Sequence, residues 1–241
     1  NGKTVDVSGA RYEPVGEFYQ KGIALSSAEM HENGMYLLFD ASVLCNNAGM
    51  LPPGRKGDHW SIIGDPTEAA MLVMAAKGGE DIEARRKALP RIGQLPFDSV
   101  RKMMTSINLV DGKPLAYTKG APKETLSLCN RILIDGKAAP ITESMRETIL
   151  AENDSQAREG LRILAVAYRP LDFSEGFTVE NTEKDLLFLG LVGMMDPPRP
   201  EVPKAIELCH RAGIRVVMIT GDYGLTALSI AKKIGLTKTE E

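Results

Sequence analysis

Three prolines within four positions divide this chain of 241 residues into two parts. Pro197, Pro198 and Pro200 follow a nearly apolar run at residues 186–195. Proline has no backbone N–H to donate and is confined to strand ends, edges and turns, so a strand in this run must end there. The pattern therefore predicts one domain over residues 1–196 and a second part over residues 197–241.

The first part has the pattern of an antiparallel sheet with flanking helices. The predicted strands lie at residues 91–96, 103–110, 115–119 and 162–168. Asp111-Gly112 predicts a hairpin turn between the second and the third of them. Asp65, Pro66 and Glu68 occupy the N-cap, first and third positions of a predicted helix over residues 66–77. We expect an α/β chain of the α+β type here.

The second part has the pattern of a parallel unit. Its predicted elements are a strand at 187–194, a helix at 202–212, a strand at 214–220 and a helix at 225–234. Alternation of strand and helix predicts a partial parallel βαβα unit. The strand core at residues 214–219 lacks predicted neighbours on its sheet, so we expect an exposed edge that pairs with another copy of the chain.

Charge and apolar content exclude several classes of function. A formal net charge of −3, with both signs mixed along the chain, provides no broad positive field for a nucleic acid. The longest nearly apolar run is roughly half as long as a bilayer crossing requires. The three histidines show no ligand spacing with Cys45, Cys129 and Cys209. Nucleic-acid binding, a membrane span and a complete metal site are therefore not expected.

A candidate ligand site lies at the ends of the predicted strands. Phe97, Lys102 and Lys119 stand at the ends of neighbouring strands, and Arg162 begins another. A nucleotide site without a glycine-rich phosphate loop needs an aromatic face for the base and cations for the phosphates. Each residue also has an ordinary interpretation, as a core aromatic or a solvated strand end, so spacing alone leaves both open.

An acidic residue in the second part has two interpretations as well. Asp222 follows a predicted strand at its carboxyl end, where open α/β sheets gather ligands. It either faces a phosphate or Mg²⁺, or it caps the helix that follows. The sequence pattern does not decide between the two.

Six short segments carry a resemblance. They are Gly64-Asp65-Pro66-Thr67-Glu68, Phe97-Asp98-Ser99-Val100-Arg101-Lys102-Met103-Met104, Lys119-Gly120-Ala121-Pro122, Gly160-Leu161-Arg162, Asp196-Pro197-Pro198-Arg199 and Thr220-Gly221-Asp222. In this order and spacing the chain resembles the P-type cation-transporting ATPases, specifically their calcium-pump-like branch. The resemblance implies that residues 1–196 are the nucleotide-binding domain and residues 197–241 a fragment of the haloacid-dehalogenase-like phosphorylation domain.

The resemblance also implies roles for individual residues. Phe97 would stack on adenine, Glu68 would approach its amino edge, and Lys119 with Gly120 would line the pocket. Lys102 and Arg162 would hold the phosphates of ATP. The residues implied near the phosphorylation site of the longer protein are Asp196, Arg199, Thr220, Gly221 and Asp222.

The same resemblance implies what the longer protein does. It would hydrolyse ATP through an aspartyl-phosphate, with Mg²⁺, and transport a cation such as calcium. Its remaining phosphorylation, actuator and transmembrane domains would be the partners of this chain, which would lie on the cytoplasmic side of a membrane. The sequence contains no Asp-Lys-Thr-Gly-Thr segment to supply the nucleophile, so we expect ATP binding without turnover and no catalytic residue in this chain.

Two alternatives remain at this point. Lys123 stands where the family usually has Glu after Gly-Ala-Pro, which fits a regulatory or interaction module that has kept the fold without the nucleotide. A phosphatase of the haloacid dehalogenase type fits the βαβα pattern, but it requires an Asp nucleophile on an earlier strand.

Overall fold

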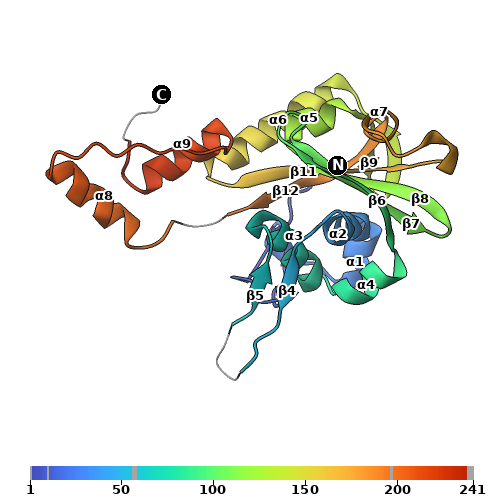
Figure 1. The fold of residues 1–241 in the computed structure, drawn as a ribbon, viewed down its shortest axis with the longest axis horizontal. Helices are drawn as coiled ribbons and strands as arrows, with labels where there is room; N and C mark the ends of the chain where they lie inside the picture. Colours follow the sequence, from blue (N-terminus) through green and yellow to red (C-terminus); the bar gives the residue numbers. More distant parts are fainter. Residues whose placement is uncertain (1, 10, 56–58, 196–197, 238–241) are drawn as a thin grey trace. The chain divides into compact units, whose positions relative to one another are not determined.

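The chain folds as two compact units in the computed structural model, which describes residues 2–9, 11–55, 59–195 and 198–237 (Figure 1). The first unit comprises residues 1–142 and 165–192. The second comprises residues 143–164 and 193–241. The chain therefore leaves the first unit, returns to it and leaves it again. The boundary expected after residue 196 falls on Asp196 and Pro197, which lie outside the described residues.

A seven-stranded sheet forms the centre of the first unit, with the strand order β10-β9-β12-β11-β8-β7-β6. The strands are β6 Arg91–Asp98, β7 Met103–Val110, β8 Lys113–Gly120, β9 Cys129–Ile134, β10 Lys137–Pro140, β11 Arg162–Pro170 and β12 Leu186–Met194. Neighbours from β6 through β7 and β8 to β11 pair antiparallel, as do β9 and β10. This confirms the predicted antiparallel fold with flanking helices.

Helices cover both faces of this sheet. Those of the first unit are α1 Ser27–Glu32, α2 Met35–Leu44, α3 Pro66–Lys77, α4 Ile82–Ala88, α5 Pro122–Ser127 and α7 Val179–Thr182. Figure 1 shows α2, α3 and α4 on one side of the sheet and α5 on the other. Because both faces are covered, residues 103–108 of β7 are all buried rather than alternating.

The start of α3 confirms the helix signal in the sequence. The Asp65 side chain accepts hydrogen bonds from the backbone N–H groups of Thr67 (2.8 Å) and Glu68 (3.1 Å), and Pro66 occupies the first turn. These bonds satisfy N–H groups that have no partner within a helix. The cap therefore fixes the first turn of α3, from which the Glu68 side chain projects.

The first unit also contains short strands outside the main sheet. They are β1 Asp6–Val7, β2 Phe18–Gln20 and β3 Ile23–Ala24 in one sheet, and β4 Gly49–Leu51 and β5 Ser61–Ile63 in another. A 3-10 turn, η1, spans Phe173–Glu175. Within the described residues no helix combines the length and the apolar character that a membrane crossing would need.

The second unit corrects the predicted parallel βαβα arrangement. It contains α6 Glu143–Arg158, α8 Val202–Arg211 and α9 Gly224–Lys233, but residues 214–220 form no strand in the described chain. The apolar run at 187–194 belongs to β12, which pairs parallel with β9 of the main sheet. A strand requires a hydrogen-bonding neighbour, and none of the described strands pairs with residues 214–220.

This correction also affects the expected self-association. Residues 214–220 carry exposed apolar side chains, and Ile219 is 94% exposed. They offer apolar surface but no ordered strand edge to pair with another copy. The expectation of edge-to-edge pairing through residues 214–219 therefore has no structural basis in this form of the chain.

Candidate functional site

One row of paired residues brings the strand ends together. Asp98 of β6 pairs with Met103 of β7, Met103 pairs with Gly120 of β8, and Gly120 pairs with Ala165 of β11. We call these four residues the strand-end row. Phe97, Lys102 and Lys119 each adjoin a member of the row in the sequence, so the sheet gathers one aromatic ring and two ammonium groups at one end.

A β-bulge beside the row exposes Phe97. Leu95 pairs with Thr105 and Asp98 with Met103, so β6 has one more residue than β7 over this stretch. A bulge of this kind bends a strand and redirects its side chains, and β6 is an edge strand that tolerates it. Phe97 is consequently 64% exposed instead of buried in the core.

The turn that follows Phe97 is held by its own side chains. Asp98 Oδ1 accepts hydrogen bonds from the backbone N–H groups of Val100 and Arg101, both at 2.9 Å. These two N–H groups hold the pKa of the Asp98 carboxyl below its usual range. Lys102 closes the turn with a left-handed backbone, φ 54°, and its N–H bonds to the Asp98 carbonyl at 2.7 Å.

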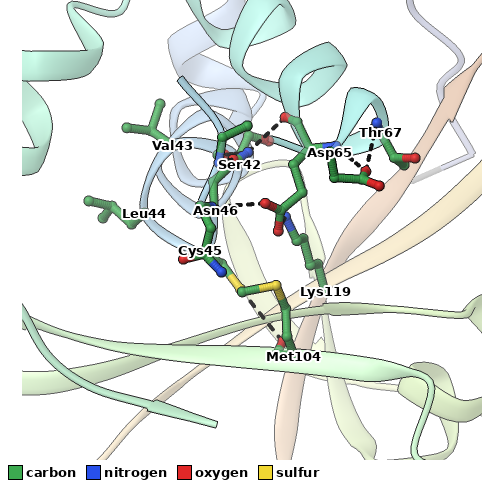
Figure 2. A network of polar contacts seen from close by, with 12 residues as sticks. Ser42, Val43, Leu44, Cys45, Asn46, Asp65, Thr67, Met104 and Lys119 are labelled. Atoms are coloured by element: carbon green, nitrogen blue, oxygen red, sulfur yellow. Dashed lines mark hydrogen bonds and ion pairs between the residues drawn. The ribbon is translucent and has the colours of Figure 1, made fainter. Parts of the chain in front are cut away.

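Lys119 and Glu68 form a buried ion pair below the row. Lys119 Nζ lies 2.8 Å from Glu68 Oε1, and the two side chains are 5% and 14% exposed. The ion pair lacks hydrogen-bond geometry, and within the described part of the chain Lys119 Nζ makes no hydrogen bond. Figure 2 shows Lys119 extending from the sheet toward Asn46, at the end of α2.

A polar network holds Glu68 in this position. Its Oε2 atom accepts the backbone N–H of Asn47 at 3.0 Å. The Asn46 amide donates to the carbonyls of Glu68 (2.8 Å) and Ser42 (2.9 Å), and its Oδ1 accepts from the Ala48 N–H at 2.9 Å. The end of α2 is thereby fixed to the first turn of α3 (Figure 2).

Two arginines that sequence reasoning missed support the same network. Arg91 donates to the carbonyls of Leu44 and Asn46, both at 2.7 Å, and Arg86 donates to that of Ala48 at 3.0 Å. The Leu44 carbonyl is at the end of α2, where carbonyls have no partner within the helix, and the carbonyls of Asn46 and Ala48 belong to the loop that follows. The arginines are at least 38 residues from these carbonyls in the sequence, so no local pattern signals the contacts.

Lys102 has a carboxylate partner on α5. Its Nζ lies 2.7 Å from Glu124 Oε1. Burial acts to raise the pKa of Glu124, but the hydrogen bond from Lys102 and the charges of Lys102 and Lys123 bring it below its usual value. The exposed Lys123 therefore favours the ionised carboxylate of its neighbour.

Gly120 is required by the close approach of two strands. A Cβ atom at this position would lie 2.4 Å from the Cβ of Met103 and 2.7 Å from the carbonyl oxygen of Lys102. Such distances are well inside van der Waals contact, so any side chain would push β7 and β8 apart. Gly120 thus keeps Lys102 and Lys119 at their observed spacing.

The second unit holds the remaining candidate residues. Arg162 forms an ion pair with Asp222, whose backbone N–H also bonds to Thr220 Oγ1 at 3.0 Å. Arg199 and Gly221 are exposed, and Asp196 lies outside the described residues. Within the described ranges there is no group of three His, Cys, Asp or Glu side chains that could hold a metal ion. The structure thus pairs Glu68 with Lys119 and Arg162 with Asp222.

Comparison with known proteins shows one family. The family described as "P-type ATPase, cytoplasmic domain N" matches residues 35–201. A protein named "Calcium-transporting ATPase" from Bacillus subtilis is 43% identical over 236 residues, which is 98% of this chain and 26% of that protein. "Calcium-transporting ATPase 1" from Lactococcus lactis is 38% identical over 200 residues (83% and 22%). "Cation-transporting ATPase pma1" from Synechocystis is 36% identical over 248 residues (98% and 26%). The chain spans about a quarter of the length of these relatives.

Proposed function

The chain belongs to the P-type ATPases, and on this premise we propose that it binds ATP at the strand-end row. The observation that carries the proposal is the ammonium group of Lys119, which is buried and makes no hydrogen bond within the described residues. Its described polar contact is the 2.8 Å ion pair with Glu68, which takes up one of the three donors of the ammonium group, and leaving the others without acceptors is unfavourable. A ligand rich in acceptors would satisfy them, and a nucleotide is such a ligand.

The adenine ring is proposed to stack on Phe97. An exposed aromatic ring next to a turn held by its own hydrogen bonds is a preformed platform, so stacking requires little ordering of the protein. Glu68 would accept a hydrogen bond from the adenine amino group. Its carboxylate has about four acceptor positions, and the contacts with Asn47 and Lys119 leave capacity for another donor.

Lys102 of the first unit is proposed to hold the phosphates, and the family resemblance alone implies the same role for Arg162 of the second unit. Both side chains now face carboxylates, Glu124 and Asp222, and both are more than half exposed. If a triphosphate takes the place of the carboxylate, each of these cations still has an anionic partner. The described residues do not themselves form a Mg²⁺ site, and we propose that Mg²⁺ arrives bound to the phosphates.

The activity of the longer protein is proposed from the family. In that protein ATP would phosphorylate an aspartate outside this chain and drive cation transport, with calcium as the proposed ion because two of the relatives are named calcium-transporting ATPases. The remaining phosphorylation, actuator and transmembrane domains would be the partners of this chain on the cytoplasmic side of a membrane. Asp196, Arg199, Thr220, Gly221 and Asp222 are proposed near the phosphorylation site. The chain alone is expected to bind ATP without turnover.

Calorimetric titration with ATP, with and without Mg²⁺, tests the proposal. Phe97→Ala should weaken binding by about 5- to 150-fold, the range that corresponds to roughly 1–3 kcal/mol for one base stacked on an aromatic ring. Phe173 is a matched control, because it is an aromatic residue of the same unit with similar exposure, and Phe173→Ala should leave the Kd unchanged.

Two results would contradict the proposal. Absence of binding at millimolar ATP would favour the regulatory or interaction module. Turnover of a simple phosphomonoester with Mg²⁺ by the isolated chain would instead favour the phosphatase.

A further inference from the structure

Glu183 is a buried carboxylate on a segment far in the sequence from the residues proposed to bind the nucleotide. It follows α7, and its side chain is only 2% exposed. Both of its oxygens lie 2.5 Å from Arg101 Nη1, and Oε1 also accepts the hydroxyl of Thr105 at 2.8 Å. The contact with Arg101 joins residues 82 positions apart in the sequence.

Arg101 connects Glu183 to the turn between β6 and β7. Its Nη2 atom donates to the carbonyl of Pro96 at 2.7 Å, while its Nη1 atom is bound to Glu183. Pro96 directly precedes Phe97, and Lys102 directly follows Arg101. The Arg101 guanidinium therefore ties both ends of the turn to one fixed carboxylate.

Glu183 lies on the face of the sheet opposite to the ion pair between Lys119 and Glu68. The Thr105 hydroxyl lies 2.9 Å from that of Thr118 on β8, which links the two strands beneath Glu183. Thr118 and Lys119 are consecutive in a strand, so their side chains point to opposite faces. Glu68 thus acts from one face of the sheet and Glu183 from the other.

We propose that Glu183 is a positioning residue for the nucleotide, acting through Arg101 on Phe97 and Lys102 without touching the ligand. The inference rests on the proposed ATP binding. A buried ion pair contributes little net stability compared with apolar residues of the same volume, whereas the geometry it imposes is specific. Here the ion pair fixes the turn that carries Phe97, the proposed platform for adenine, and Lys102, one of the cations proposed to hold the phosphates.

The experiment measures the Kd of ATP for Glu183→Gln by calorimetry. We expect the Kd to rise roughly tenfold, because a platform displaced from its productive position loses part of its stacking. Asp40→Asn is the matched control. Asp40 is similarly buried and is bound by Arg85 Nε at 2.5 Å, but it joins α2 to α4. It should lower stability and leave the Kd within twofold.

Two further variants separate positioning from general destabilisation. In Arg101→Met/Glu183→Met no unpaired charge remains, so the urea midpoint should recover while the Kd stays raised. In a Phe97→Ala background, Glu183→Gln should raise the Kd by a smaller factor than in the unchanged chain, because one of the two residues on which it acts is already lost. Recovery of affinity together with stability, or full additivity with Phe97→Ala, would overturn the inference.

Hydrogen exchange distinguishes this inference from the proposed function. Amides of residues 99–102 should exchange faster in Glu183→Gln than in the unchanged chain, and Asp40→Asn should not alter them. Equal exchange in Glu183→Gln and the unchanged chain would refute the hold on the turn, whatever the chain binds. Faster exchange in Glu183→Gln, combined with no ATP binding by the unchanged chain, would support the contact between Glu183 and the turn and overturn its role in nucleotide binding.

Discussion

Glu68→Gln should lower the free energy of unfolding of the first unit by about 2–3 kcal/mol. Removal of one partner from a buried ion pair leaves an uncompensated charge and typically costs about 3–5 kcal/mol. The loss here is smaller because the Glu68 side chain is 14% exposed and admits some water. Lys119, at 5% exposure, has no described hydrogen bond to replace the lost contact.

The converse substitution should cost less. In Lys119→Met the Glu68 carboxylate keeps the N–H of Asn47 as a donor and its own partial access to water. The order of the two losses therefore follows from which partner is left without compensation. If both charges were equally compensated by other contacts, the two substitutions would lower the free energy of unfolding equally.

Urea unfolding measures both variants. Trp60 is the only tryptophan and lies in the first unit, so its fluorescence reports on that unit. Glu124→Gln is the control, because it breaks a comparable ion pair whose lysine is 56% exposed, and it should change stability by less than about 1 kcal/mol. Equal losses for Glu68→Gln and Glu124→Gln, or a larger loss for Lys119→Met than for Glu68→Gln, would refute the reasoning from burial.

Two further predictions concern the same end of the sheet. Gly120→Ala should lower stability by about 1–3 kcal/mol and weaken ATP binding, because its Cβ would meet Met103 at 2.4 Å; Gly190→Ala, with open space around it, should do neither, and equal urea midpoints would contradict this. The pKa of Glu124 is lowered in the folded chain, so its contribution to stability is present above the ordinary value of 4.5 and is lost as the pH falls through the lower folded pKa. Urea midpoints measured from pH 6 to about pH 3 should accordingly fall less steeply for Glu124→Gln than for the unchanged chain, and parallel curves would count against the ion pair with Lys102.

Local signals in the sequence determined the elements whose geometry depends on neighbouring residues. The helix start at Asp65 and Pro66 is a contact between residues two and three apart, and the structure confirms it. Asp111 and Gly112 both have positive φ, 50° and 75°, as the predicted hairpin turn requires. The hairpin turn and the two strands on either side of it make β7 and β8 antiparallel neighbours. This pairing places Lys102 and Lys119 near one end of the sheet.

Tertiary structure decided what depends on partners far away in the sequence. Residues 214–220 have the pattern of a strand but form none, because a strand requires hydrogen-bonding neighbours that composition cannot supply. Residues 187–194, in contrast, have β9 as a hydrogen-bonding neighbour and therefore form a strand of the main sheet. The pairing of Glu68 with Lys119, and the hold of Glu183 on Arg101, also depend on folded distances. Periodicity and turn chemistry report on a few adjacent residues, whereas burial and the pairing of charges are properties of the assembled fold.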